Sequence, residues 1–242
     1  MRRWIVLISL VVILVGLTVW TTSLGRIGTS IAFTYSDILS ATRSHLVLVF
    51  VPVLAAIVII VPLGILITRP KLKKLAPGVI GAGNVGQSIP SLAVIAIMVP
   101  LIGFGLLPAF IALFIYGLLP ILRNSYASMN NIDPAVIEAA LGMGMTRWQI
   151  IRKIELPLAR PVIMTGIRIS TVVTVGTAEL AVLIGVHSLG RITLAGVFAG
   201  EPLIILQGAA PTALLAIVLG FLLERIESWM TPRGLKFKAR TA

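Results

Sequence analysis

The feature that most constrains this chain is a series of apolar runs, each near the length that crosses a lipid bilayer. A helix needs about 20 mainly apolar residues to cross the hydrocarbon core, because each residue advances it by about 1.5 Å. Only 12% of the 242 residues are charged, whereas 58% are hydrophobic. The sequence therefore predicts an all-α integral membrane protein with about six transmembrane helices, over residues 4–20, 46–68, 77–101, 106–122, 161–186 and 203–223.

The basic residues set the predicted orientation. A formal net charge of +12 would suggest a nucleic-acid partner in a soluble protein. Here, with the N-terminus placed in the cytoplasm, all but three of the 20 Lys and Arg residues fall on the cytoplasmic side; the three are Arg26, Arg43 and Arg191. Cytoplasmic segments of membrane proteins are enriched in Lys and Arg. We therefore expect a multi-pass protein with both termini in the cytoplasm and no nucleic-acid partner.

The first apolar run has two interpretations. Arg2 and Arg3 precede it, as basic residues precede the apolar part of a cleaved signal peptide. The run is long, however, and no clear A-x-A cleavage site follows it. This favours an uncleaved first helix, and whether it is cleaved stays open.

No catalytic or metal-binding arrangement stands out. The absence of cysteine excludes disulfides, thiolate metal sites and thiol catalysis. The two histidines, His45 and His187, fall in or beside the outer segments, which disfavours haem ligation within the bilayer. No G-x-x-x-x-G-K-[ST] motif occurs, so the chain has no P-loop for ATP. We therefore expect no catalytic residues, no bound metal and no cofactor in this chain.

One motif matches a dinucleotide-binding fingerprint in the wrong context. Residues 81–86 read GAGNVG, which fits G-x-G-x-x-G. The fingerprint requires a preceding strand and a βαβ unit with an acidic residue about 20 positions on, whereas here the motif enters an apolar run. The small residues instead favour close packing between helices.

Residues 131–161, NIDPAVIEAALGMGMTRWQIIRKIELPLARP, interrupt the apolar sequence with strong helix signals. Asp133 is a good N-cap, and Pro134 suits the first helical position, where no N–H is needed. Gly142 and Gly144 then end this helix. The apolar stripe of the predicted helix consists of Val136, Ile137, Ala140 and Leu141.

A second short helix is predicted to follow the glycine corner. Thr146 and Gln149 form a capping box, and Pro157 and Pro161 limit the helix because proline lacks an N–H and clashes with the preceding turn. Its apolar stripe consists of Ile150, Ile151 and Ile154. Neither helix is long enough to span a bilayer. The loop therefore either lies on the membrane surface or inserts into a groove of another protein.

The spacing within this loop resembles that of a known family. Glu138-Ala139-Ala140, three residues, Gly144, nine residues and Ile154-x-Leu156-Pro157 match the EAA–G–I-x-LP pattern of permease subunits of binding-protein-dependent ABC importers. The likeness covers roughly residues 77–235 and is close to the permeases for glycine betaine, carnitine and choline. It is also carried by IPSLA at 89–93, YGLLPILRNSY at 116–126 and GTAELAVLIG at 176–185.

The resemblance implies a fold, partners and a location. It implies the MetI-like type I ABC importer fold in the bacterial cytoplasmic (inner) membrane, and pairing with a second permease copy or a paralogue. Cytoplasmic ATPases, which bind ATP and Mg, would dock on the loop helices, and an external solute-binding protein would deliver an osmoprotectant. The coupling role then falls on Glu138, Ala139, Ala140, Gly144, Ile154, Leu156 and Pro157.

On this view the chain has three parts. Residues 1–75 hold N-terminal transmembrane helices and a basic cytoplasmic anchor loop, residues 76–235 form the permease core with the coupling loop 131–161, and residues 236–242 form a basic cytoplasmic tail. The sequence leaves open which solute is carried and whether the permease dimer is made of one or two kinds of chain.

Glu179 supports an alternative function. It is the one carboxylate well inside a predicted span, where a charge costs about 3 kcal/mol, so we expect it to face protein or the water of a translocation pathway. The other interpretation is that it is hydrated near the outer helix end. An ion-coupled carrier or channel that uses Glu179 is the alternative to the importer, although it leaves the capped loop unexplained. A membrane scaffold or enzyme subunit is a third hypothesis.

Overall fold

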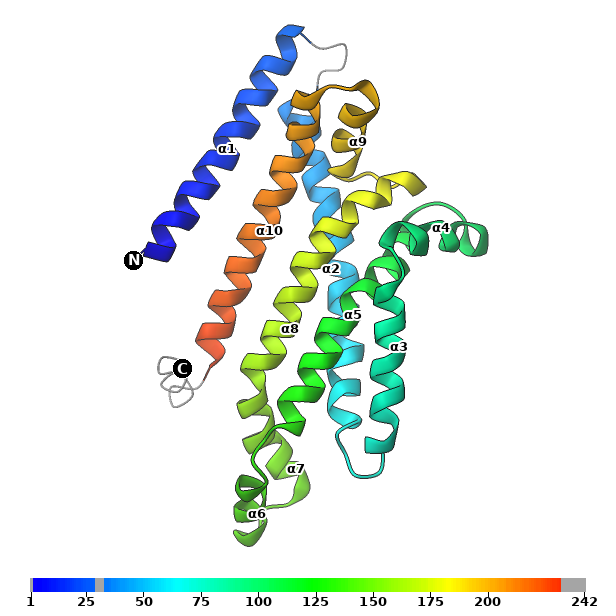
Figure 1. Cartoon of the computed structure of the whole chain (residues 1–242). Coiled ribbons are helices and arrows are strands. Elements are labelled where there is room, and N and C mark those ends of the chain that lie inside the picture. Colours follow the sequence, from blue (N-terminus) through cyan, green and yellow to red (C-terminus); the bar gives the residue numbers. More distant parts are fainter. Residues whose placement is uncertain (1, 29–32, 232–242) are drawn as a thin grey trace.

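The computed structural model describes residues 2–28 and 33–231, with side chains for 8–23 and 33–231, and over these residues the regular structure is entirely helical (Figure 1). The predicted basic tail, 236–242, lies outside the described residues, and so do the side chains of Arg2 and Arg3. The longest helices are α1 (Arg2–Gly28), α2 (Tyr35–Leu66), α5 (Leu106–Asn130), α8 (Leu156–Thr177) and α10 (Pro202–Met230). The shorter elements are η1 (Lys73–Leu75), α3 (Ala76–Ser88), α4 (Ser91–Ile102), α6 (Pro134–Gly142), α7 (Arg147–Ile150), η2 (Ile151–Glu155), η3 (Ala178–Ile184) and α9 (Gly190–Ala199).

The predicted apolar runs all lie on helices. Four described helices are long and apolar enough to cross a membrane, and the bent pair α3–α4 raises the number to five. These four are Tyr35–Leu66, Leu106–Asn130, Arg147–Ile184 and Pro202–Met230. The first predicted run lies on α1, a helix of 27 residues over Arg2–Gly28, of which the side chains of Ile8–Ser23 are described. The prediction of an all-helical membrane protein is confirmed.

The third predicted run, 77–101, is not one helix. The helical segments on either side of the break, Lys73–Ser88 and Ser91–Ile102, meet at 95°. The break falls at Ile89, which is extended (φ −75°, ψ 128°) because a residue before proline is disfavoured in the helical region. At the break the Ile89 carbonyl has no helical hydrogen-bond partner, and the Tyr116 hydroxyl of α5 donates a hydrogen bond to it. Apolar composition alone does not reveal such a bend.

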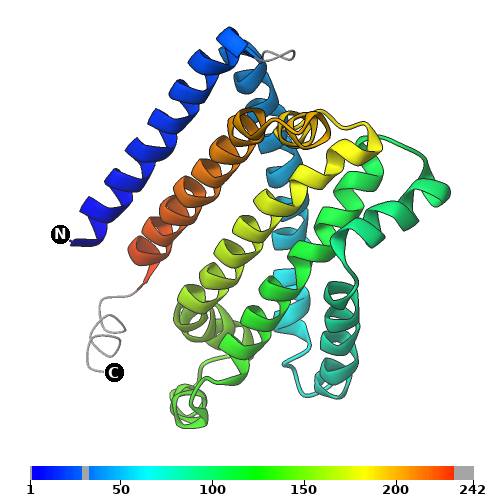
Figure 2. The same ribbon diagram turned by 45° about the horizontal axis from the view of Figure 1, so that its top comes forward.

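The core lies where α5 packs between α8 and α2 (Figures 1 and 2). Helix α10 lies along α8, and α1 lies along the outer side of α10. Two buried polar side chains make hydrogen bonds across helices: His45 Nε2 of α2 is 3.0 Å from the Val175 carbonyl oxygen, and Gln207 Nε2 of α10 donates to the Thr21 carbonyl oxygen at 2.9 Å. Such bonds fix the rotation of each helix, since a buried polar group without a partner is costly.

The GAGNVG segment packs as the sequence analysis predicts. It lies in α3, which rests on α5. A Cβ atom on Gly83 would lie 3.0 Å from Leu119 Cδ1, and one on Gly86 would lie 3.3 Å from Ile115 Cγ2. These two glycines therefore let the helices approach closely, and the packing interpretation is confirmed.

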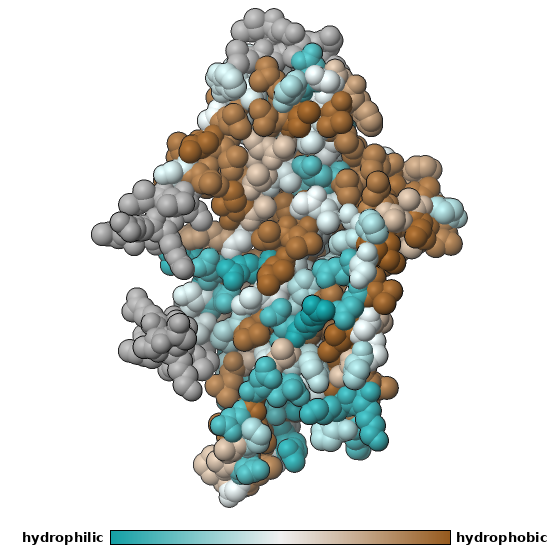
Figure 3. Space-filling model, in the orientation of Figure 1, coloured by the Kyte–Doolittle hydropathy of each residue, from teal (hydrophilic) through white to brown (hydrophobic). Residues whose placement is uncertain are grey.

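The polar and apolar surfaces are separated along the molecule. Figure 3 shows brown hydrophobic residues over most of the upper part, whereas hydrophilic residues gather in the lower part and reach the middle of this face. The α6 corner lies at the lower end, beyond the ends of the long helices (Figure 1). The loop is thus presented outside the apolar body.

Candidate functional site

Helix α6 forms the first half of the coupling loop as predicted. It runs over Pro134–Gly142, with Pro134 at its start. Asp133 caps it, since its Oδ1 accepts a hydrogen bond from the Ala135 N–H at 2.9 Å. The local sequence signals are sufficient to form this helix, because every one of them acts within a single turn.

The corner after α6 is fixed by Gly144. Its φ is +77°, a left-handed conformation that glycine adopts without a Cβ penalty. The Gly144 N–H donates to the Leu141 carbonyl at 2.9 Å, and the Met145 N–H donates to the Ala140 carbonyl at 3.1 Å. This is the Schellman arrangement, which satisfies the last carbonyls of a helix and reverses the chain. A Cβ on Gly144 would meet no atom within 4 Å, so the requirement for glycine is one of backbone conformation.

The second half of the loop departs from the prediction. The capping box is present: Gln149 N–H donates to Thr146 Oγ1 at 3.3 Å, and Thr146 N–H donates to Gln149 Oε1 at 2.8 Å. However, Pro157 and Pro161 do not limit a short helix. Helix α7 continues through the π-helical turn Ile151–Glu155 into α8, and the helix is continuous over Arg147–Ile184, 38 residues.

The π turn explains how the helix passes Pro157. The Leu156 N–H donates to the Ile151 carbonyl, five residues back instead of four. This extra residue resets the hydrogen-bond register, so Pro157 falls in the first turn of α8, where a missing N–H costs little. The prediction of a separate second helix is therefore wrong, and the corner is joined directly to a membrane span.

The predicted coupling residues divide between surface and interior. Glu138 and Ala139 are exposed, whereas Ala140 is completely buried. Ile154, Leu156 and Pro157 are partly buried on the helix that follows. The predicted stripe of α6 does not pack as one face: Ala140 is buried, whereas Val136 and Leu141 are each 39% exposed.

Two large apolar side chains at the corner were not predicted as site residues. Met143 is 73% exposed and Trp148 is 67% exposed, on either side of Gly144. One sequence feature could have indicated this exposure. Trp148 follows the Thr146 helix cap in a loop that is too short to form a hydrophobic core of its own. With Val136 and Leu141 they form an exposed apolar set at the tip of the molecule, which we call the corner surface.

Glu155 anchors the loop to the bundle. Its Oε2 lies 2.6 Å from Arg69 Nη2, which follows the end of α2. Glu155 is 9% exposed, so the pair is largely shielded from water. The sequence analysis placed Arg69 in the basic anchor loop and gave Glu155 no role. The only sequence feature that pointed to an ion pair was that Glu155 is the single carboxylate among the Arg and Lys residues of 147–160.

Glu179 lies in η3, the 3₁₀ segment that follows α8, at the end of the continuous helix opposite to α6. It is partly buried, and its Oε1 accepts a hydrogen bond from Thr193 Oγ1 of α9 at 3.4 Å. Helix α9 approaches the Glu179 backbone closely because Gly190 has no side chain: a Cβ there would overlap the Glu179 backbone carbonyl. The structure thus places the Glu179 carboxylate beside a hydroxyl of α9.

The described residues contain no group of three His, Asp or Glu side chains arranged to hold a metal ion. His187 Nδ1 is 3.3 Å from Ser44 Oγ, and His45 contacts the backbone of α8, so each histidine has a partner within the bundle.

Comparison with known proteins identifies the family. A family model described as "Binding-protein-dependent transport system inner membrane component" matches residues 60–234. The chain belongs to this family. It is 42% identical over 200 residues to the glycine betaine/carnitine/choline transport system permease protein OpuCB of Bacillus subtilis, covering 83% of this chain and 91% of that one. It is 43% identical over 196 residues to the osmoprotectant import permease protein OsmY of Salmonella typhimurium, covering 81% and 83%.

A solved structure supports the same fold. A chain of the MetNI methionine ABC transporter, in an inward-facing conformation, superposes with a TM-score of 0.72 at 26% identity. The match covers 81% of this permease and 96% of that chain. The predicted MetI-like fold is therefore confirmed, as is the resemblance to osmoprotectant permeases. The permease is an inner membrane component of a transport system, and its named relatives are transport subunits.

Proposed function

We propose that this permease forms the membrane path of an ATP-driven importer that takes up glycine betaine, carnitine or choline. The observation that carries the proposal is the corner surface, which is joined rigidly to a membrane span through the continuous helix Arg147–Ile184. The names of its relatives, which specify osmoprotectant, carnitine and choline transport, support the solute class.

The proposed partner of the corner surface is a cytoplasmic ATPase that binds ATP and Mg. Exposed apolar patches mark sites that meet another protein or a membrane, and Met143 and Trp148 supply two large exposed apolar side chains at this corner. A short helix with exposed apolar residues is suited to a groove. Glu138, exposed on the same helix, is then placed to pair with a basic residue of the ATPase.

The proposed coupling follows from the length of the helix. At about 1.5 Å per residue, 38 helical residues extend roughly 57 Å, more than the thickness of a bilayer. A helix of this kind moves as a rigid body, so closure of the docked ATPases shifts the span that carries the corner. A second permease, either another copy or a paralogue, would complete the path, and an external binding protein would deliver the solute. The loop and both termini would lie in the cytoplasm, as the distribution of basic residues favours.

The test is purification of the tagged permease from its native membrane. We expect an ATPase subunit to co-purify, and the complex to hydrolyse ATP faster when solute-loaded binding protein is added. Proteoliposomes that contain the complex should accumulate labelled glycine betaine only with ATP inside. Accumulation by the permease alone, driven by an ion gradient, would contradict the proposal and support a carrier.

A further inference from the structure

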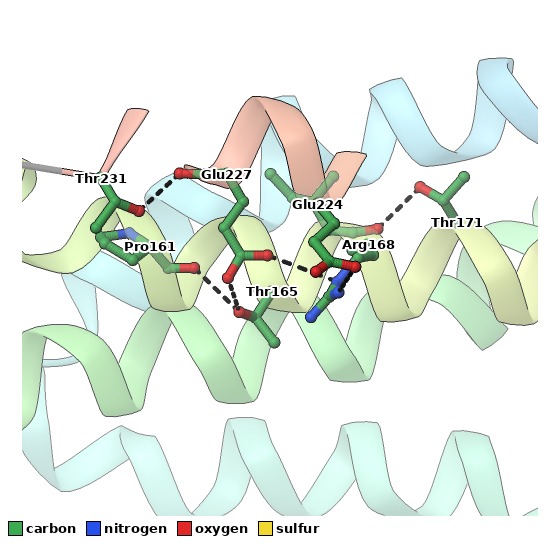
Figure 4. Close-up of polar contacts among 8 residues, drawn as sticks. Pro161, Thr165, Arg168, Thr171, Glu224, Glu227 and Thr231 are labelled. Atoms are coloured by element: carbon green, nitrogen blue, oxygen red, sulfur yellow. Dashed lines mark hydrogen bonds and ion pairs between the residues drawn. The ribbon is translucent and has the colours of Figure 1, made fainter. Parts of the chain in front are cut away.

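Three ionisable residues, Arg168 of α8 and Glu224 and Glu227 of α10, join these two helices (Figure 4). Arg168 Nη1 lies 3.4 Å from Glu224 Oε2, and Arg168 Nε lies 3.6 Å from Glu227 Oε2. Thr165 Oγ1 donates to Glu227 Oε1 at 2.9 Å. One guanidinium thus faces two carboxylates, and both ion pairs are longer than the roughly 2.7–2.9 Å of a strong charge-assisted hydrogen bond.

A groove of about 450 Å³ opens beside this cluster. Its walls are mainly apolar, with a charge of each sign at one end. The lining residues are Arg168, Ile169, Val172, Ala216, Ile217, Gly220, Phe221 and Glu224. An apolar cleft with a few converging polar groups is the usual form of a small-molecule site.

The charges lie at the cytoplasmic edge of the predicted spans, since Glu224 and Glu227 directly follow the predicted run 203–223. Arg168 is 16 residues from the end of the continuous helix at Ile184, about 25 Å along the axis, and the hydrocarbon core is about 30 Å thick. Ionisable side chains near the end of a membrane helix reach the interface or a neighbouring protein segment. Glu224 is 52% exposed and Arg168 is 30% exposed, so the charged end of the groove is open.

We propose that this groove is a binding site on the translocation path for a zwitterion that carries a carboxylate and a quaternary ammonium group. This inference rests on the proposed function. The planar Arg168 guanidinium matches a carboxylate, and Glu224 supplies the countercharge for the cation. Phe221 also lines the groove, and the Arg225 guanidinium carbon lies 5.2 Å from its ring centroid, so one face of this ring already contacts a cation.

The two carboxylates have different tasks in this site. Glu227 is 20% exposed and tied to Thr165, so it holds Arg168 in position. Glu224 is the more exposed partner, and its Oε2 lies 3.4 Å from Arg168 Nη1, against 3.6 Å between Glu227 Oε2 and Arg168 Nε. A zwitterion inserts between Arg168 and Glu224 and replaces one ion pair with two, so no charge is left unpaired while the solute is bound.

The first test compares two solutes in the reconstituted importer, assembled with its ATPase and binding protein. Glycine betaine has a carboxylate and choline has none. Arg168→Gln should raise the KM for glycine betaine by about tenfold, the order expected for one lost charge-assisted bond, and change the KM for choline less than twofold. Glu224→Gln should weaken transport of both. Arg160→Gln removes an exposed charge from the same helix. It should leave the ratio of the KM for glycine betaine to the KM for choline unchanged.

The outcomes distinguish failure of the binding site from failure of the proposed importer function. An equal loss for both solutes in Arg168→Gln, with normal expression, would make the cluster a structural ion pair and overturn the site. Unchanged kinetics would overturn it as well. If the wild-type complex shows no ATP-driven uptake, the proposed function fails.

A second test does not require transport. The chain contains no cysteine, so a single introduced cysteine reports on one position. Ala216→Cys, in the groove, should react with a charged methanethiosulfonate reagent in membranes, and glycine betaine should slow that reaction several-fold. Leu222→Cys is the control, since Leu222 is 49% exposed on α10 but does not line the groove. Absence of reaction at Ala216→Cys, or reaction without protection by glycine betaine, would contradict the site.

Discussion

Arg69 and Glu155, 86 residues apart in sequence, meet in an ion pair of 2.6 Å between Nη2 and Oε2. The pair ties the segment after α2 to the π turn at the base of α8. Its side chains are 27% and 12% exposed, so solvent screens it less than a surface pair. It joins the helix that follows the α6 corner to the rest of the bundle.

Loss of Arg69 should therefore both destabilise the permease and loosen coupling. Arg69→Met leaves the Glu155 carboxylate shielded without a partner, and we expect a loss of about 1–3 kcal/mol in stability. Thermal unfolding in detergent measures this. Arg69→Met with Glu155→Met should recover part of the stability, and Lys71→Gln, a neighbouring exposed cation, should have no effect. Equal stability of the single variant and the wild type would contradict the role of the pair.

Gly144 should tolerate a side chain poorly, in contrast to Gly142. Gly144→Ala forces a Cβ into the left-handed region and should cost about 1 kcal/mol, whereas Gly142→Ala in the last turn of α6 should be neutral or stabilising. The readouts are ATPase co-purification and solute-stimulated ATP hydrolysis. If both variants behave alike, the corner conformation does not matter for docking.

The corner surface should behave as a binding hot spot. Trp148→Ala removes a side chain that is 67% exposed, so thermal stability should barely change, whereas ATPase affinity should fall by about 30-fold or more. Glu138→Lys should weaken docking further through like-charge repulsion. Trp229→Ala, with an 86% exposed tryptophan on α10, is the matched control. Full docking by Trp148→Ala with Glu138→Lys would show that the ATPase binds elsewhere.

Glu179→Gln should alter uptake while assembly stays intact. The substitution keeps an acceptor for Thr193 Oγ1 but removes the charge. We expect changed KM or maximal rate for at least one solute in proteoliposomes, with a normal yield of the assembled complex. Glu201→Gln, in the segment between α9 and α10, serves as the comparison. Uptake kinetics identical to wild type for every solute would exclude Glu179 from the pathway.

The orientation has a direct test. A reporter fused after Asn130 should be cytoplasmic, and one fused near Ser36 should be external, because the basic residues favour the side that holds the coupling loop. An external signal from the Asn130 fusion would overturn both the orientation and the docking proposal.

The sequence by itself determined the features that depend on neighbours along the chain. Apolar runs mark the membrane helices, because the bilayer requires about 20 apolar residues in a row. The Asp133 cap, the Thr146 capping box and the left-handed Gly144 were all predictable, since each involves hydrogen bonds or sterics within about five residues. The spacing of the loop was enough to indicate the family.

Only the tertiary structure decided the relationships between distant segments. The π turn carries the helix past Pro157, which the sequence analysis took as a helix limit, because the shifted hydrogen-bond register places this proline in the first turn of α8. Likewise, Ala140 is buried while Leu141 is exposed, although both lie on one predicted stripe. The pairs Arg69–Glu155 and Arg168–Glu224 join elements that sequence spacing does not relate. Such contacts arise only when the helices pack, since packing selects which face of each helix meets which neighbour.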